Sequence, residues 1–248
     1  MCANPELVND MKIGLLQCDD VAEPLRARHG NYPDMVQAML DAVDRRLQFQ
    51  TWRCHEGQIP AADAGVDGWI MTGSKCSAND AAPWIQELSH FVRQLWNEQQ
   101  PLVGICFGHQ LIAHALGGRV DKSPNGWGVG VMIHDLKKRQ PWMTPWHGRT
   151  VQLLASHQDQ VMQIPEDAVV LAGSDFCPNY MMQIGDVFLG VQGHPEFTRG
   201  YAADLMEMRR DVIPEKWIEA GLRSLKLHAD DMAVARWILN FMQRNRVR

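Results

Sequence analysis

Short apolar runs alternate with longer amphipathic stretches through the first half of the chain. The runs predict buried β-strands, because they are short and end at polar or glycine-containing segments. Between them, apolar side chains recur at helical spacing over Tyr32 to Leu47 and over Trp84 to Glu98. Helices that alternate with strands in this way are typical of crossovers between parallel strands. The predicted strands are Met11 to Gln17, Gln48 to Cys54, Gly68 to Thr72 and Pro101 to Cys106.

After Gly117 and Gly118 the apolar runs become shorter and turn residues separate them, which predicts added, partly antiparallel strands. From Tyr201 onward the spacing is helical again. The pattern therefore predicts an α/β fold, with an open, mostly parallel central sheet flanked by helices and a small additional, partly antiparallel strand region. No linker or repeat interrupts residues 1–248, so we expect a single domain with a C-terminal helical extension over residues 198–248. The added strands are Gly128 to Ile133, Arg149 to Ala155, Val169 to Gly173, Tyr180 to Ile184 and Val187 to Gln192.

Composition excludes several classes of protein. Hydrophobic residues make up 46% of the 248 residues and charged residues 21%, which is ordinary globular usage. The formal net charge is −5 and the basic residues are scattered, so nucleic-acid binding is not expected. No apolar stretch is long enough for a membrane span and no targeting segment is visible, so no membrane partner is expected and the default location is the cytoplasm. The six cysteines form no CxxC pair and H-E-x-x-H is absent, so we expect neither a disulfide framework nor a metal site.

The strongest chemical signal is the segment 103–110, Val-Gly-Ile-Cys-Phe-Gly-His-Gln, where an apolar strand runs into a helix. Cys106 occupies the turn between them. Gly104 and Gly108 allow a sharp backbone and close packing there, as in the nucleophile elbow of serine hydrolases. The helix N-terminus favours an anion, and the Phe107 N–H could donate to an oxyanion. Taken alone, a core cysteine between two packing glycines is an equally good interpretation.

A cysteine nucleophile needs a base, and His194 is the best placed of the ten histidines. It follows an apolar strand, at the edge where open α/β sheets bind ligands. Pro195 favours an extended backbone at His194, so His194 and Glu196 are expected to project to the same side. Glu196 could then orient the imidazole. By itself, Gly-His-Pro-Glu would more often be a surface turn.

Together, these two segments resemble the class I, triad-type glutamine amidotransferases. The family reads G-x-C-x-G-x-Q at its nucleophile and G-x-x-x-H-P-E at its base, and both motifs match this chain within residues 12–197. The resemblance implies a flavodoxin-like fold and assigns Cys106 as nucleophile, His194 as base and Glu196 as its orienting carboxylate. It also places Gly73, in Thr72 to Lys75, beside Phe107 in the oxyanion hole. Synthase-linked members usually carry Ser-Gly-Gly-Pro in that loop, so the loop is more similar to a stand-alone branch that includes γ-glutamyl peptidases.

The resemblance also implies a glutamyl-binding pocket. Gln110 occupies the family position that contacts the glutamyl group, and Ser156, His157 and Asp159 lie in a segment beside that pocket. A γ-glutamyl substrate carries an α-ammonium group, which needs a carboxylate partner. Asp159 and Asp175 are both candidates, and the residues do not decide between them.

The resemblance implies hydrolysis of a γ-glutamyl amide through a Cys106 thioester, with no cofactor. Three hypotheses follow: a glutaminase or stand-alone amidotransferase, a γ-glutamyl peptidase acting on larger amides, and a non-catalytic binding protein on the same fold. The expected partner is a small γ-glutamyl molecule. A synthase that uses the ammonia would be a separate protein. The sequence gives no basis for predicting the oligomeric state.

Overall fold

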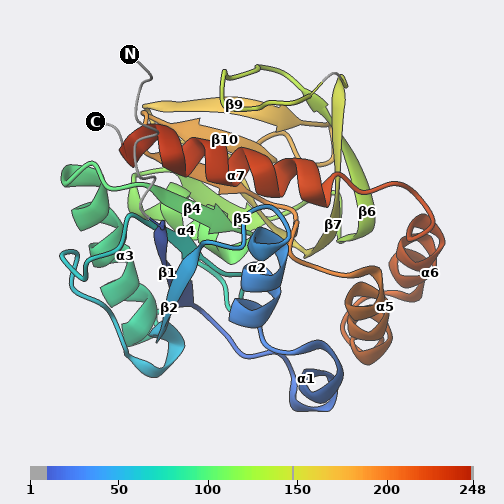
Figure 1. The fold of residues 1–248 in the computed structure, drawn as a ribbon. Helices are drawn as coiled ribbons and strands as arrows, with labels where there is room; N and C mark the ends of the chain where they lie inside the picture. Colours follow the sequence, from blue (N-terminus) through green and yellow to red (C-terminus); the bar gives the residue numbers. More distant parts are fainter. Residues whose placement is uncertain (1–9, 147, 247–248) are drawn as a thin grey trace.

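The predicted parallel sheet is confirmed in a computed structural model, which describes residues 10–146 and 148–246 (Figure 1). Its parallel strands run in the order β2-β1-β3-β4-β11. This is the flavodoxin-like order of doubly wound sheets. The strands are β1 (Lys12–Gln17), β2 (Gln48–Arg53), β3 (Gly68–Met71), β4 (Leu102–Ile105) and β11 (Phe188–Val191).

Helices cover both faces of this sheet. On one face, α2 (Tyr32–Asp41) and α7 (Asp231–Arg246) pack their apolar side chains on residues such as Ile13 and Val103. On the other face, α3 (Pro83–Asn97) and α4 (Phe107–Ala115) pack against residues such as Leu16 and Met71. Strands β1, β3, β4 and β11 are buried from both sides, which is why they read as continuous apolar runs in the sequence, whereas the edge strand β2 is exposed or half-buried throughout.

The predicted antiparallel strands extend the same sheet beyond β11. Each is antiparallel to its neighbour, in the order β11-β10-β9-β6-β7. A separate two-stranded sheet, which we did not predict, pairs β5 with β8. The strand bounds are β5 (Arg119–Lys122), β6 (Gly128–Leu136), β7 (Thr150–His157), β8 (Asp159–Gln163), β9 (Ala168–Gly173) and β10 (Met181–Ile184).

The helix predicted over Tyr32 to Leu47 ends earlier, at Asp41. Beyond it, the Asp44 carboxylate accepts hydrogen bonds from the backbone N–H and the guanidinium of Arg46. Such a local side-chain bond offers the backbone an alternative to the helix. The apolar residues Val43 and Leu47 still pack on the core, but from the segment that joins α2 to β2.

The chain beyond β11 is helical, as predicted, and forms three helices that the sequence pattern did not separate. These are α5 (Arg199–Met208), α6 (Glu215–Ser224) and α7. The short helix α1 (Glu23–His29) was missed, because it buries none of its residues and so has no apolar periodicity. Helix α5 lies beside α1 and against β7 (Figure 1).

The described cysteines, Cys18, Cys54, Cys76, Cys106 and Cys177, are free thiols, and Cys2 lies outside the described residues. Within residues 10–146 and 148–246, no helix has the length and apolarity that crossing a bilayer would require.

The junction of β4 and α4 depends on two glycines, which gives a test of the fold. A Cβ on Gly104 would overlap the carbonyl carbon of Gly108. We expect Gly104→Ala to lower the free energy of unfolding by about 1–3 kcal/mol, the usual cost of overpacking, as measured by urea denaturation. Gly200→Ala is the control, since a Cβ at Gly200 in α5 meets only ordinary contacts and its stability should be equal or slightly higher. Equal destabilisation of both variants would contradict the packing argument.

Candidate functional site

Three neighbouring parallel strands end at the same edge of the sheet and carry the candidate residues. Strand β4 lies between β3 and β11. Gly73 follows β3, Cys106 follows β4 and His194 follows β11. The site is therefore at the carboxyl edge of the sheet, where open α/β folds bind ligands.

Cys106 lies in the tight turn between β4 and α4. Its backbone has φ 52° and ψ −102°, a left-handed φ that side chains other than glycine rarely adopt. Hydrogen bonds hold this conformation: the Cys106 N–H donates to the Val191 carbonyl at 2.8 Å, and its carbonyl accepts from the Gln110 N–H at 3.0 Å. A Cβ on Gly108 would lie 2.6 Å from the Met71 carbonyl oxygen, so the turn packs directly on β3. Strain of this kind costs about 1–3 kcal/mol and is typical of functional sites.

His194 and Glu196 lie on the same side of the chain, and His194 Nδ1 is 2.7 Å from Glu196 Oε1. The His194 N–H donates to the Leu154 carbonyl at 2.8 Å, which ties its backbone to β7. Phe197 stacks on the imidazole, with ring centroids 3.8 Å apart and an interplanar angle of 11°. The ring is thus held through one nitrogen, through its backbone and across one face.

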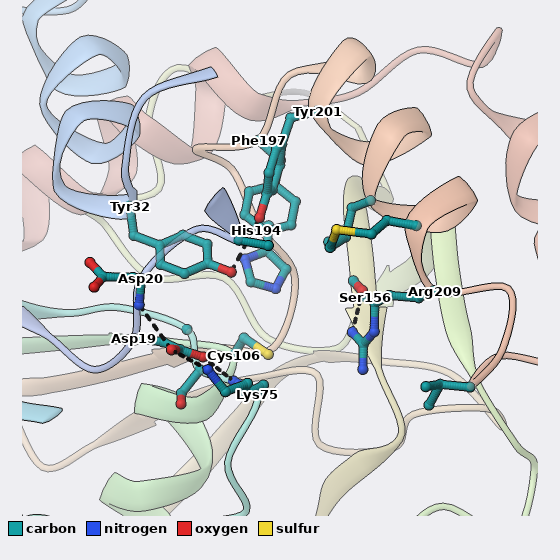
Figure 2. A pocket seen from close by; sticks show the side chains of 16 residues that line it. Asp19, Asp20, Tyr32, Lys75, Cys106, Ser156, His194, Phe197, Tyr201 and Arg209 are labelled. Carbon is teal, nitrogen blue, oxygen red and sulfur yellow. Dashed lines mark hydrogen bonds and ion pairs between the residues drawn. The ribbon is translucent and has the colours of Figure 1, made fainter. Parts of the chain in front are cut away.

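The imidazole, the thiol and the Gly73 backbone meet at one point. A Cβ built on Gly73 would lie 2.9 Å from His194 Cε1 and 3.7 Å from Cys106 Cβ. Figure 2 shows the imidazole next to the Cys106 sulfur. His194 Nε2 is buried and has no conventional hydrogen-bond partner among the described residues. Burial disfavours the imidazolium, but the negative charges of Glu196 and of the Cys106 thiolate raise the pKa of His194 above its usual value.

The loop after β3 is braced by the segment that follows β1. Thr72 Oγ1 accepts from the Cys18 N–H at 3.0 Å and donates to the Gly73 carbonyl at 3.1 Å. The buried Asp19 carboxylate accepts from both the backbone N–H and the Nζ of Lys75, at 3.0 and 2.9 Å. Asp19 was missed from the sequence, because its role depends on the pairing of β1 with β3 rather than on any local motif.

Two cavities meet at Cys106. The Asp159 cavity, of about 400 Å³, is lined by Ser77, Gln110, His157 and Asp159 among others. The Tyr201 cavity, of about 300 Å³, is lined by Gly73 and His194 among others. Figure 2 shows His194, Phe197 and Tyr201 on its walls. The residues that line both cavities are Ser74, Lys75, Cys106, Ser156, Arg209 and Val212. A substrate on the sulfur could therefore extend in two directions.

The predicted substrate-binding residues lie together in the Asp159 cavity. Gln110 Nε2 donates to the Asp159 carbonyl at 2.8 Å and to Gln192 Oε1 at 3.0 Å, which fixes the Gln110 amide. The Asp159 carboxylate accepts from Ser77 Oγ at 2.7 Å. Asp175, the other candidate for the ammonium partner, is not among the residues that line either cavity.

His157 and Ser156 also line the Asp159 cavity, but their polar groups are engaged differently. His157 is buried, with Nδ1 3.2 Å from the Asp159 carbonyl. Burial, together with the positive charge of His194, lowers the pKa of His157 to about 4. With this pKa, His157 is neutral at pH 7. Ser156 Oγ accepts a hydrogen bond from the Arg209 guanidinium at 3.3 Å.

Several lining residues come from segments that carry no motif. Arg209 ends α5, and its guanidinium lies 5.0 Å from the centre of the Trp127 ring. Tyr32 begins α2, and Tyr201 lies on α5; the Tyr201 hydroxyl donates to the Tyr32 hydroxyl at 3.2 Å. Only tertiary contacts bring these residues to Cys106, so periodicity could assign them to helices but not to the site.

One group of potential metal ligands lies at the edge of the Tyr201 cavity. Ligand atoms of Asp20, His55 and Glu56 lie within 4.8 Å of one another. The Arg53 guanidinium already donates to both carboxylates, at 2.9 Å to Asp20 and 2.6 Å to Glu56. A cation there would compete with a guanidinium, so this group supports no metal site.

Comparison with known proteins decides the family. The model of the class I glutamine amidotransferase family matches residues 31–209. The chain belongs to this family. Its members are generally Cys-His-Glu amidohydrolases, and the matched residues include Cys106, His194 and Glu196.

Individual relatives include two kinds of enzyme. The chain is 30% identical over 200 residues to γ-glutamyl peptidase 3 of Arabidopsis thaliana. The aligned region covers 78% of this chain and 79% of that protein. It is 33% identical over 201 residues to a GMP synthase of Porphyromonas gingivalis, covering 76% of this chain and 38% of the synthase. A glutamine amidotransferase from Methylobacillus flagellatus has the same fold, with a TM-score of 0.70 at 21% identity, over 95% of this chain and 93% of that one.

The raised pKa of His194 predicts how stability depends on pH. In the unfolded chain the imidazole titrates near its ordinary value of about 6.5. The pKa of His194 is higher in the folded state. The imidazolium therefore adds stability that is fully present below the unfolded-state pKa and is lost as the pH rises through the folded-state pKa. We therefore expect Glu196→Gln to destabilise the protein more at pH 6 than at pH 10, measured by urea denaturation. Glu207→Gln, at an exposed ion pair with Arg210, whose charge does not change between pH 6 and pH 10, is the control for general effects of charge removal. If the difference in free energy of unfolding between wild type and Glu196→Gln is no smaller at pH 10 than at pH 6, the stabilisation of the His194 imidazolium by Glu196 is contradicted.

Proposed function

We propose that the protein hydrolyses the γ-amide bond of glutamine or another γ-glutamyl compound through a covalent Cys106 thioester. The observation that carries the proposal is the convergence of the Cys106 turn with the His194–Glu196 pair at one sheet edge, 2.7 Å separating His194 Nδ1 from Glu196 Oε1. Family membership supports it, since the motifs match those of cysteine amidohydrolases.

The reaction proceeds in two steps. His194 takes the proton of the Cys106 thiol, the sulfur attacks the γ-carbonyl carbon, and the carbonyl oxygen becomes an oxyanion that the Gly73 and Phe107 N–H groups stabilise. His194 gives that proton to the nitrogen, so the C–N bond breaks and the amine leaves. A γ-glutamyl thioester remains. His194 then takes a proton from water, and the hydroxide attacks the thioester carbon. The C–S bond breaks, His194 returns the proton to the sulfur, and glutamate leaves.

In the Asp159 cavity, Gln110 and Asp159 bind the glutamyl group. The carboxylate of Asp159 pairs with the α-ammonium, and Ser156 and His157 complete the wall of this cavity. A charge-assisted hydrogen bond of this kind contributes about 1.5–3 kcal/mol. The Ser77 hydroxyl, 2.7 Å from Asp159 Oδ2, holds the carboxylate in place.

A glutaminase that supplies ammonia to a separate synthase is the second candidate. The similarity to a GMP synthase of Porphyromonas gingivalis favours it, while the similarity to a γ-glutamyl peptidase favours action on larger amides. The two candidates share the chemistry at Cys106 and differ in the leaving group. A non-catalytic binding protein is the third hypothesis, and it predicts an unreactive thiol.

The first test is product release from glutamine and from a γ-glutamyl dipeptide. Cys106→Ala is expected to lower kcat by at least about 10³-fold, because it removes the nucleophile. In the wild type, added hydroxylamine should divert the thioester to γ-glutamyl hydroxamate. Cys54→Ala, at a buried thiol that directly follows β2 and lines neither cavity, is the control. Undiminished turnover in Cys106→Ala would overturn the mechanism. No turnover on either substrate, with Cys106 unreactive toward a glutamine-like electrophile, would favour the binding protein.

The role of Asp159 has its own test. We expect Asp159→Asn to raise KM for a γ-glutamyl substrate about 10-fold to 100-fold with a smaller effect on kcat, since it removes the charge that pairs with the α-ammonium. Asp175→Asn is the matched control, because Asp175 lines neither cavity. Steady-state kinetics on both variants measures this. A larger rise in KM for the Asp175 variant would transfer the role to that residue.

A further inference from the structure

The Tyr201 cavity is much larger than the product of glutamine hydrolysis requires. It holds about 300 Å³, whereas ammonia is about as large as water, whose share of liquid volume is about 30 Å³. Its inner end is formed by His194, which lines this cavity but not the Asp159 cavity. The group that protonates the departing nitrogen must face it, so the amine lies on the Tyr201 side of the sulfur.

The walls of this cavity are mostly apolar and aromatic. Tyr32, Tyr201 and Leu205 form one side, continuous with a buried cluster of the core. Met208 and Val212 line the outer part, and they are 39% and 55% exposed. Large apolar side chains exposed beside a cavity favour an apolar ligand, because binding removes their surface from water.

The acidic groups in this cavity are already neutralised. The Asp19 carboxylate accepts from Lys75 Nζ at 2.9 Å. Asp20 accepts hydrogen bonds from Arg53 at 2.9 Å and from Asn31 at 2.6 Å. Burial raises the pKa of the Asp20 carboxyl, but these partners lower it by more, so the pKa lies below its usual range. An ammonium group on the ligand would gain little from carboxylates that are paired in this way.

We propose that the Tyr201 cavity is a binding site for the amine portion of the substrate, and that it selects γ-glutamyl amides whose amine carries a bulky apolar or aromatic group. This inference rests on the proposed function. The amide C–N bond breaks as described above, and the amine leaves through the outer end of the cavity between Met208 and Val212. Glutamine has no group that fills the Tyr201 cavity, so it is the poorer substrate.

The substrate preference is measured with a series of γ-glutamyl amides: glutamine, the ethylamide, the n-butylamide, the benzylamide and a butylamide that ends in an ammonium group. We expect kcat/KM to rise with apolar size, by about tenfold or more between glutamine and the benzylamide, because each buried methylene adds to discrimination. The ammonium-ended amide should be slower than the n-butylamide. A flat series, or a preference for the ammonium-ended amide, would overturn the inference.

A pair of variants links this preference to the cavity. Met208→Asp places a charge at the outer end, and we expect it to reduce the ratio of kcat/KM for the benzylamide to that for glutamine by about tenfold. Met232→Asp, at a methionine of α7 that is 43% exposed and does not line the cavity, should leave the ratio unchanged. Equal ratios in wild type and Met208→Asp would contradict the assignment.

The outcomes separate this inference from the proposed function. Hydrolysis of glutamine at Cys106 without any preference for apolar amides would overturn only the role of the cavity. Absence of hydrolysis throughout the series, with an unreactive Cys106, would overturn the proposed function itself.

Discussion

The turn between β4 and α4 is the constraint on which the candidate site depends. Hydrogen bonds to β11 and α4 hold Cys106 at φ 52°. The backbone packs so closely at Gly104 and Gly108 that neither position has room for a side chain. Because β4 lies in the centre of a sheet covered on both faces, the surrounding core supplies the stability that offsets the strain.

The second determinant is the order in which strands meet at the edge. Strand β11 comes late in the chain but lies directly beside β4, so His194 reaches Cys106 although 88 positions separate them in sequence (194 − 106 = 88). The antiparallel strands add to this arrangement rather than merely extending the sheet, since β7 holds the His194 backbone through Leu154. Phe197 then limits the tilt of the imidazole by stacking on it.

The sequence predicted the parallel strands and the positions of Cys106 and His194 at their ends, because those features have local signals: apolar runs, paired glycines and a proline after His194. The position of Gly73 came from the family resemblance instead. The sequence did not predict α1 or β5, whose exposed surfaces leave too few apolar positions to create a period, or β8, a five-residue strand with only two apolar residues. It also missed Asp19, Tyr32 and Arg209. Each of these reaches the site through the packing of elements that are distant along the chain, and a carboxylate or a tyrosine in a loop or at a helix start has many equivalent positions elsewhere. Only the structure shows that Asp159 lines a cavity at Cys106 and that Asp175 lines neither cavity.

The position of the sulfur between two cavities has a consequence for the order of events during turnover. In the proposed mechanism, the glutamyl group of the acyl-enzyme occupies the Asp159 cavity, while the Tyr201 cavity is vacated as soon as the amine departs. Water can then enter through the Tyr201 cavity and reach His194, which lines it. The proposed mechanism therefore makes the amine the first product and glutamate the second, and an amine that dissociates slowly would itself protect the thioester from hydrolysis.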